Sequence, residues 1–321
     1  MSKLSLGLPP TGRLAWALCG LIAAADAIWF ALARPFGMDW ESMIALSPFM
    51  ALLVAAAHYC THMRPAPRIA NVCLTLAFLY LMTFAVALLS YLSVAVRPPL
   101  QDEAFALVDR RLGFDWLALL AWTSEHKWAA AGMTKAYQSS AAQTIGVALL
   151  FSLLNRPKEL YAFLALYALT AIAVIVVSTP WPAAGAYPYY QPDPALYPLP
   201  AAKSGLWHWE QFKAIRDGLL ARFDLVDAQG VIQFPSFHTA LAVITAYAVR
   251  RVRYLGPAVL ALNAVVIVST LPIGGHHLID VLAGAAIAGL AILAVRRVEG
   301  RAEKRAQGPS TQSGDAVAAA H

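Results

Sequence analysis

The apolar residues of this chain are grouped into long blocks, and short polar connections separate them. Most blocks reach or approach the roughly 20 residues that an α-helix needs to cross the hydrocarbon core of a bilayer. The eight blocks are Leu14–Ala33, Ser42–Cys60, Ile69–Val96, Ala136–Leu154, Glu159–Thr179, Phe237–Val249, Tyr254–Leu271 and His276–Val295. The pattern predicts an all-α fold, a polytopic membrane helix bundle of about eight transmembrane helices.

The basic residues occupy every second connection between these blocks. They are Lys3 and Arg13, Arg64 and Arg68, Arg156 and Lys158, Arg250, Arg251 and Arg253, and Arg296 and Arg297. Short basic connections are cytoplasmic by the positive-inside rule, and the other connections carry most of the acids. Both termini are therefore predicted to be cytoplasmic. We expect a multi-pass protein of the bacterial inner membrane. The candidate site, whose residues are given below, is expected to face the periplasm.

Composition agrees with a membrane protein and argues against a nucleic-acid partner. Hydrophobic residues make up 60% of the chain and charged residues 13%, against about one quarter charged in a soluble domain. The net charge of +6 follows the alternation of the connections, so it reports topology. Cys19, Cys60 and Cys73 all fall inside apolar blocks and give neither a disulfide framework nor metal-ligand spacing.

Two of the outer connections are too long to be simple turns. Pro98–Lys135 interleaves apolar and charged residues, which predicts one or two amphipathic helices in the membrane interface. Trp181–Gln233 is rich in proline and aromatic residues. It predicts a cap that packs over the helices, and a role in shaping the substrate site is an equal alternative.

We expect three parts along the chain. Residues 1–97 form N-terminal transmembrane helices, residues 98–295 form a catalytic membrane domain, and the polar residues 296–321 form a disordered cytoplasmic tail. The first block could also be a signal peptide. Its apolar run continues through Leu32, however, and is longer than a typical signal core.

Two short stretches place reactive residues where an apolar helix begins. Phe234–Thr239 contains a proline and a serine directly before an apolar run, so Ser236 is a candidate N-cap. Gly274–Asp280 contains paired glycines, which allow close backbone approach, followed by two histidines. By the predicted topology both helices start at the same membrane face. Two helix N-termini directed at one point favour an anion such as phosphate.

His276 and Asp280 are four residues apart and share one helical face. The carboxylate can orient the imidazole so that its other nitrogen is a nucleophile. His238, from the other helix, is then available as a general acid. A metal site of His238, His276, His277 and Asp280 is the less favoured alternative because no second ligand cluster supports it. We expect neither a metal nor a cofactor.

At these residues the chain resembles the phosphatidic acid phosphatase type 2 superfamily. Pro235-Ser236-Phe237-His238 matches its Pro-Ser-Gly-His signature, with phenylalanine replacing glycine. Ser269, His276 and Asp280 match the signature of Ser-Arg, five residues, His, three residues and Asp, with Thr270 replacing arginine. The signature of Lys, six residues and Arg-Pro is not found.

Loss of that first signature, with both histidines and the aspartate kept, is similar to the inositol phosphorylceramide synthase-like branch. The resemblance covers residues 100–295. It implies that His276 is a nucleophile that forms a phosphohistidine, that Asp280 orients it and that His238 is the acid. The implied reaction moves a phospho-headgroup such as phosphoinositol to a lipid hydroxyl. A lipid phosphate phosphatase that uses water is the alternative, and a non-catalytic lipid-binding protein or transporter is less favoured.

The substitutions in the signatures remove basic residues that would hold the phosphate. The predicted phosphate-binding residues are Ser236, Gly275, Lys213, Arg216 and His277. Lys213 and Arg216 lie three apart in Trp209–Arg222, which is predicted to be an interfacial helix. For these basic residues, contact with lipid headgroups is an equal alternative.

Overall fold

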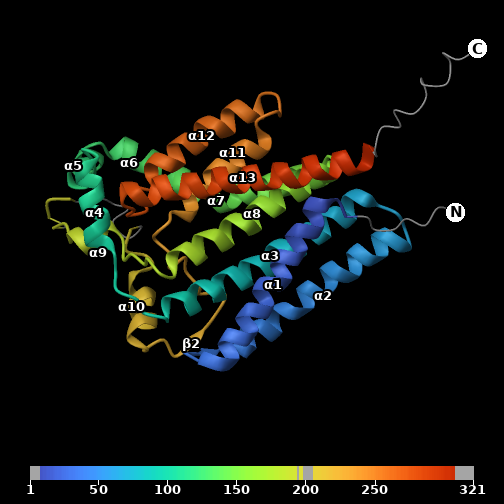
Figure 1. Cartoon of the computed structure of the whole chain (residues 1–321), viewed down its shortest axis with the longest axis horizontal. Coiled ribbons are helices and arrows are strands. Elements are labelled where there is room, and N and C mark those ends of the chain that lie inside the picture. The colour runs from blue at the N-terminus through green and yellow to red at the C-terminus, as the bar shows by residue number, and fades with distance from the viewer. Residues whose placement is uncertain (1–7, 194, 198–204, 308–321) are drawn as a thin grey trace, which may run out of the picture.

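The computed structural model describes residues 8–193, 195–197 and 205–307. This part of the chain is almost entirely helical (Figure 1). Its helices are α1 (Pro10–Ala33), α2 (Trp40–His62), α3 (Pro67–Val94), α4 (Asp102–Arg111), α5 (Trp116–Glu125), α6 (Lys127–Gln138), α7 (Ser140–Leu153), α8 (Pro157–Ser178), α9 (Ala186–Tyr190), α10 (Trp209–Asp217), α11 (Phe237–Val249), α12 (Leu255–Ser269) and α13 (Leu278–Gln307). Two strands of two residues, β1 (Gly37–Met38) and β2 (Arg222–Phe223), pair in parallel.

The predicted all-α membrane bundle is confirmed. Five helices, α1, α2, α3, α8 and α13, are long and apolar enough to cross a membrane, and α7, α11 and α12 are shorter apolar helices. Each of these eight coincides with one predicted block. Proline occupies a first-turn position in α1, α3 and α8, where its missing N–H leaves no hydrogen bond unmade.

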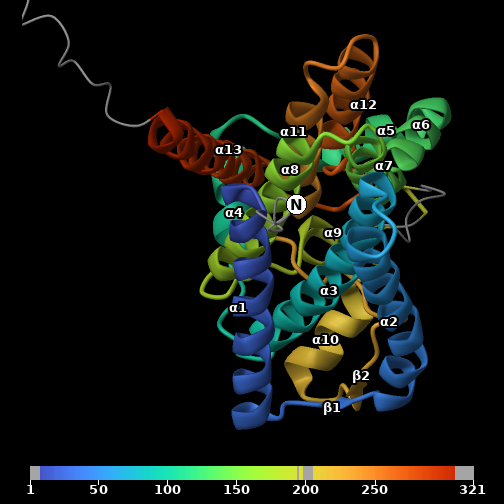
Figure 2. The same ribbon diagram turned by 90° about the vertical axis from the view of Figure 1, so that its right-hand side faces the viewer.

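The core of the bundle is built around α8. This helix packs against α1, α3, α11 and α13, and Leu160, Ala165 and Ala168 on it are fully buried. By contrast, α2 packs chiefly on α3 and is the least buried of the five long helices. In Figure 2, α1 and α2 lie on opposite sides of α3, with α10 beside their ends.

The connection from Pro98 to Lys135 contains three helices, not the predicted one or two. Gly113 has a φ of +77° and ends the first of them, a backbone conformation that favours glycine. Asp115 then caps α5 by accepting from the backbone N–H of Ala118 at 3.0 Å. In Figure 1, α4, α5 and α9 gather at the end of the bundle opposite the last turns of α13.

The last helix continues beyond the predicted boundary at Val295. Helix α13 runs to Gln307, because residues 296–307 are rich in alanine, glutamate, lysine and arginine, which are good helix formers. Glu303 also forms an ion pair with Lys158 of α8 at 2.6 Å. Of the predicted disordered tail, residues 308–321 lie outside the described residues.

Candidate active site at the N-terminal ends of α11 and α13

The two predicted motifs meet where α11 and α13 begin. The backbone N–H of Ser236 donates to the carbonyl of Asp280 at 2.9 Å. One turn further along α13, any side chain at Gly284 would collide with the Ser236 carbonyl. The glycine at this position therefore permits the close contact between the two motifs.

Helix α11 begins at the residue that the sequence indicates. Ser236 is its N-cap, and its Oγ accepts from the backbone N–H of Thr239 at 3.3 Å. This confirms the predicted cap. His238 follows in the first turn.

His276 and Asp280 form a buried pair. The His276 Nδ1 atom lies 3.3 Å from Asp280 Oδ2, and that oxygen also accepts from the backbone N–H of His277 at 2.9 Å. Helix α13 begins at Leu278, so His276 lies in the preceding loop and not in the helix as the sequence suggested. With an Nδ1–H directed at the carboxylate, His276 Nε2 carries a lone pair.

His238 is positioned by Tyr137 of α6. The two rings stack with centroids 4.2 Å apart, and the tyrosine hydroxyl lies 3.2 Å from His238 Nδ1. A hydroxyl can donate to a neutral imidazole and accept from a protonated one. Tyr137 therefore suits both protonation states of His238. No sequence pattern indicates this contact, because 101 residues separate Tyr137 from His238.

Both histidines line one cavity of about 500 Å³. Apolar side chains from α3, α7, α8 and α11 form much of its wall: Val86, Ala87, Ala141, Ala171, Val174, Ile175 and Phe237. Tyr137, His208, Gln233 and Gly274 lie with the histidines in the lining. No lysine, arginine, aspartate or glutamate lines the cavity among the residues that the structure describes.

His277 does not face this cavity or the surface. Its side chain is fully buried, with Nε2 at 3.4 Å from Asp102 Oδ1 and Nδ1 at 3.5 Å from Asp109 Oδ2. Burial alone would lower the pKa of His277, but the contacts with Asp102 and Asp109 outweigh it and raise the pKa to about 9. At neutral pH His277 is an imidazolium between two carboxylates. The predicted contact of His277 with phosphate is not seen, because both ring nitrogens face carboxylates.

The N-terminus of α13 is also occupied by the protein itself. The Asp109 carboxylate accepts from the backbone N–H groups of Leu278 and Ile279 at 2.8 and 3.0 Å. The expectation that this helix end offers free N–H groups to phosphate is not met, because a carboxylate from α4 caps it. Asp102, at the start of α4, accepts in turn from the backbone of Ala184 and Gly185.

The two predicted cations lie elsewhere. Arg216 Nη2 donates to the Pro98 carbonyl at 2.7 Å, and its guanidinium stacks on Phe212. Lys213 Nζ pairs with Glu210 at 3.1 Å. Neither residue lines the histidine cavity, since each finds partners on or beside α10.

Ser236 and Gly275 support the site without lining the cavity. The hydroxyl of Ser236 is used in capping α11. The carbonyl of Gly275 accepts from Ala186 N–H at 2.7 Å, and the φ of Gly275 is +72°. Of the predicted site residues, the structure thus brings His238, His276 and Asp280 together. Of the five predicted phosphate ligands, Ser236, Gly275 and His277 lie beside this group, whereas Lys213 and Arg216 lie on α10.

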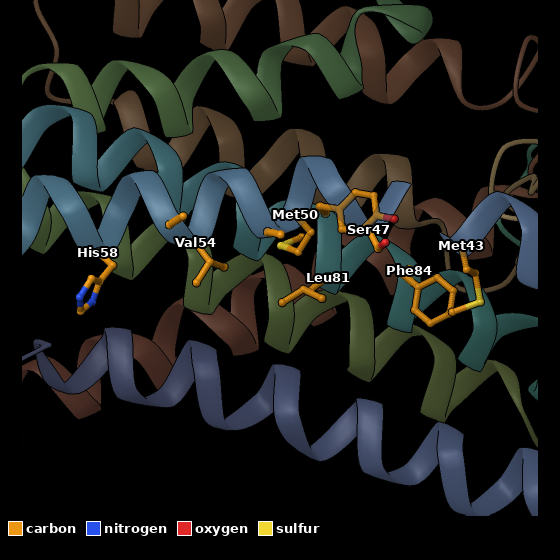
Figure 3. Close-up of a pocket in the computed structure, with 10 residues that line it drawn as sticks. Met43, Ser47, Met50, Val54, His58, Leu81 and Phe84 are labelled. Carbon is orange, nitrogen blue, oxygen red and sulfur yellow. The ribbon is translucent and has the colours of Figure 1, made fainter. Parts of the chain in front are cut away.

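A second and larger hollow, of about 780 Å³, lies between α2 and α3. Figure 3 shows Met43, Met50, Val54 and His58 of α2 facing Leu81 and Phe84 of α3. It contains none of the motif residues, so the smaller cavity is the candidate site. Across the described residues, no three His, Cys, Asp or Glu side chains are grouped as a metal site requires.

Comparison with known proteins identifies the family. A family model described as the PAP2 superfamily matches residues 103–294, more than half of the chain. The chain belongs to the PAP2 superfamily. No curated protein and no solved structure matches it. Membership supports lipid phosphatase or phosphotransferase chemistry and hence an enzyme. Together with the eight apolar helices, it makes this a multi-pass membrane protein whose substrates are lipid phosphates.

Proposed function

We propose that this PAP2-superfamily protein is a phosphotransferase of the inositol phosphorylceramide synthase-like branch. It moves a phospho-headgroup, with phosphoinositol as the headgroup that the resemblance implies, to a lipid hydroxyl through a phosphohistidine. One observation carries the proposal. The buried pair of His276 and Asp280, with His238 on the neighbouring helix, opens on a largely apolar cavity whose described lining has no charged side chain.

In the first step His276 Nε2 attacks the phosphorus of a phospholipid donor. The bond between phosphorus and the diacylglycerol oxygen breaks, and that oxygen takes a proton from protonated His238. Asp280 accepts a hydrogen bond from the Nδ1–H of His276 and stabilises the positive charge that the ring acquires. Tyr137 supports His238 before and after the proton leaves.

In the second step a lipid hydroxyl gives its proton to His238 and attacks phosphorus. The bond between phosphorus and His276 breaks, which regenerates the free imidazole. Water in place of the lipid hydroxyl gives the phosphatase alternative. The apolar wall favours the lipid, because an alkyl chain in the cavity displaces water.

The uncharged lining favours transfer of a phospho-headgroup over removal of a phosphate. A phosphate monoester such as phosphatidic acid carries a charge of about −1.5 to −2, as phosphorylated side chains do, whereas a phosphodiester carries a single negative charge. Transition-state charge needs positive or hydrogen-bonding groups near it. A cavity whose described lining has neither lysine nor arginine is better suited to the diester.

The test uses purified full-length protein in lipid nanodiscs. Phosphatidylinositol with a labelled headgroup is supplied with and without a ceramide acceptor, and labelled phosphatidic acid is supplied in parallel. We expect label on His276 from phosphatidylinositol, found by peptide mass spectrometry, and labelled product only with acceptor. His276→Ala should remove both, and His58→Ala in α2 is the matched control.

Release of free phosphate from phosphatidic acid, with no transfer from phosphatidylinositol, would replace this proposal by the phosphatase alternative. A wild-type protein that takes no label from either donor would exclude the phosphohistidine.

A further inference from the structure

Two buried polar side chains of the histidine cavity have no part in the proposed reaction. His208, which precedes α10, is 4% exposed, and Gln233, which precedes the first motif, is 5% exposed. Both line the cavity together with His238 and His276. Buried polar groups in proteins normally have hydrogen-bond partners, so the partners of these two indicate what they do.

The protonation of His208 is fixed by its surroundings. Its Nε2 lies 3.0 Å from the carbonyl oxygen of Ala184, which can only accept, so Nε2 carries the hydrogen. Burial lowers the pKa of His208 to about 4, so the ring is neutral at neutral pH and Nδ1 has a lone pair. Ala184 is itself held by Asp102, which accepts from its N–H at 2.9 Å.

This fixes the amide of Gln233 in turn. Its Nε2 lies 3.0 Å from both ring nitrogens of His208. Since His208 Nε2 is already a donor, the amide donates to Nδ1. The other polar atom of the amide, Oε1, is therefore a hydrogen-bond acceptor. No described group donates to it. Leaving such a buried acceptor unmatched costs about 1–3 kcal/mol.

The missing donor has a defined chemistry. No charged side chain lines the cavity in the described part of the chain, so neither an ammonium headgroup nor a second phosphate finds a counter-ion there. A hydroxyl is an uncharged donor of suitable size. The reacting hydroxyl cannot serve, because its single proton goes to His238.

We propose that Gln233, held by His208, is a specificity-determining residue that accepts a hydrogen bond from a non-reacting hydroxyl of the substrate. The inference rests on the proposed phosphotransfer at His276. The hydroxyl has two possible sources. One is a polyol headgroup on the donor, and the other is a second hydroxyl on the acceptor lipid.

The experiment compares paired substrates that differ only in such hydroxyls. The donor pair is phosphatidylinositol and phosphatidylcyclohexanol, read out as the rate of His276 labelling. The acceptor pair is hexadecane-1,2-diol and hexadecan-1-ol, read out as transfer from the labelled enzyme. We expect wild-type protein to prefer the hydroxylated member of one pair by about tenfold, which corresponds to about 1.4 kcal/mol.

Gln233→Met keeps the length of the side chain and removes both polar amide atoms. It should abolish the preference by lowering the rate with the hydroxylated substrate toward that with its poorer partner. A lost preference in the donor pair assigns the hydroxyl to the headgroup, and a lost preference in the acceptor pair assigns it to the acceptor. His208→Phe should reduce the same preference, since the amide is then free to turn.

Gln138→Leu is the matched control, because Gln138 also lines the cavity and is exposed. It should leave the preference intact. Equal loss on all four substrates in Gln233→Met protein, or a preference that survives, would overturn the inference while phosphotransfer stands. Wild-type protein that never labels His276 would instead overturn the proposed function, and the inference with it.

Discussion

Replacing Asp280 tests whether its charge stabilises the protonated ring of His276 during the reaction. Asp280→Asn keeps the shape of the side chain but removes the charge that stabilises a protonated His276 ring. We expect the rate of headgroup transfer to fall on the order of a hundredfold or more, with folding retained. The measurement is single-turnover transfer in nanodiscs, with thermal stability followed in parallel. Asp224→Asn, at a carboxylate outside the site, is the control and should keep wild-type activity.

The loss of rate on replacing His238 should depend on how strongly the leaving group requires protonation. His238→Ala should slow departure of a diacylglycerol oxygen far more than departure of a nitrophenolate, because only the former needs protonation. The rates of enzyme labelling from phosphatidylinositol and from a nitrophenyl phosphodiester give the two values. Equal losses with both donors would assign His238 to binding and not to acid catalysis.

His277 links the stability of the fold to pH. Its folded pKa is raised to about 9 from the ordinary 6.5, so the folded state keeps a proton that the unfolded state releases first. The contribution of the His277 ion pairs to the free energy of unfolding is complete below about pH 6.5, declines as the pH rises, and is gone above about pH 9. The Tm of wild-type protein should therefore exceed that of His277→Gln protein most at pH 6, and the difference should narrow by pH 9.5. A difference that grows with pH would contradict the ion pairs.

At the scale of elements, local patterns predicted local structure and missed what joins distant helices. Ser236 caps α11 and the eight apolar blocks are helices, because capping and hydrophobic runs depend on neighbours in sequence. Asp109 caps α13 from 169 residues away, and no spacing rule reports such a contact. Only residue type and nearness to a motif predict the five phosphate ligands. Packing gave them other partners.

Gly284 tests whether the site depends on the junction of α11 and α13. In Gly284→Ala protein the new methyl group would meet the Ser236 carbonyl and push the two motifs apart. We expect at least a tenfold loss of transfer, because misplacement by about 1 Å is costly to catalysis. Gly289→Ala lies on the same helix with nothing within 4 Å, so it should keep full activity. Similar activity in both variants would show that the junction tolerates displacement.

At the scale of the whole molecule, the site lies at one end of the bundle. The N-terminal ends of α11 and α13 are joined to α4 by Asp109, and the Ala184–Gly185 segment is joined to α4 by Asp102. The first turns of α1 and the last turns of α13 lie at the opposite end (Figure 1). The positive-inside rule, applied to the alternating basic connections, therefore predicts which side of the membrane the site faces as well as the direction of each helix.

This geometry predicts that the site faces away from the cytoplasm. The basic connections, including Arg64 with Arg68 and Arg250 with Arg251, should face the cytoplasm. A reporter protein fused after Gln307, where α13 ends, should then show activity if it is of a kind that works in the cytoplasm. A reporter that works only outside the cytoplasm should be inactive there. A short tag inserted after Asp193, which is exposed in the connection that follows α9, should be labelled by an impermeant reagent in intact bacterial cells. Lysed cells give the full signal for comparison. A tag that is protected until lysis would reverse the orientation and place the reaction on the cytoplasmic leaflet.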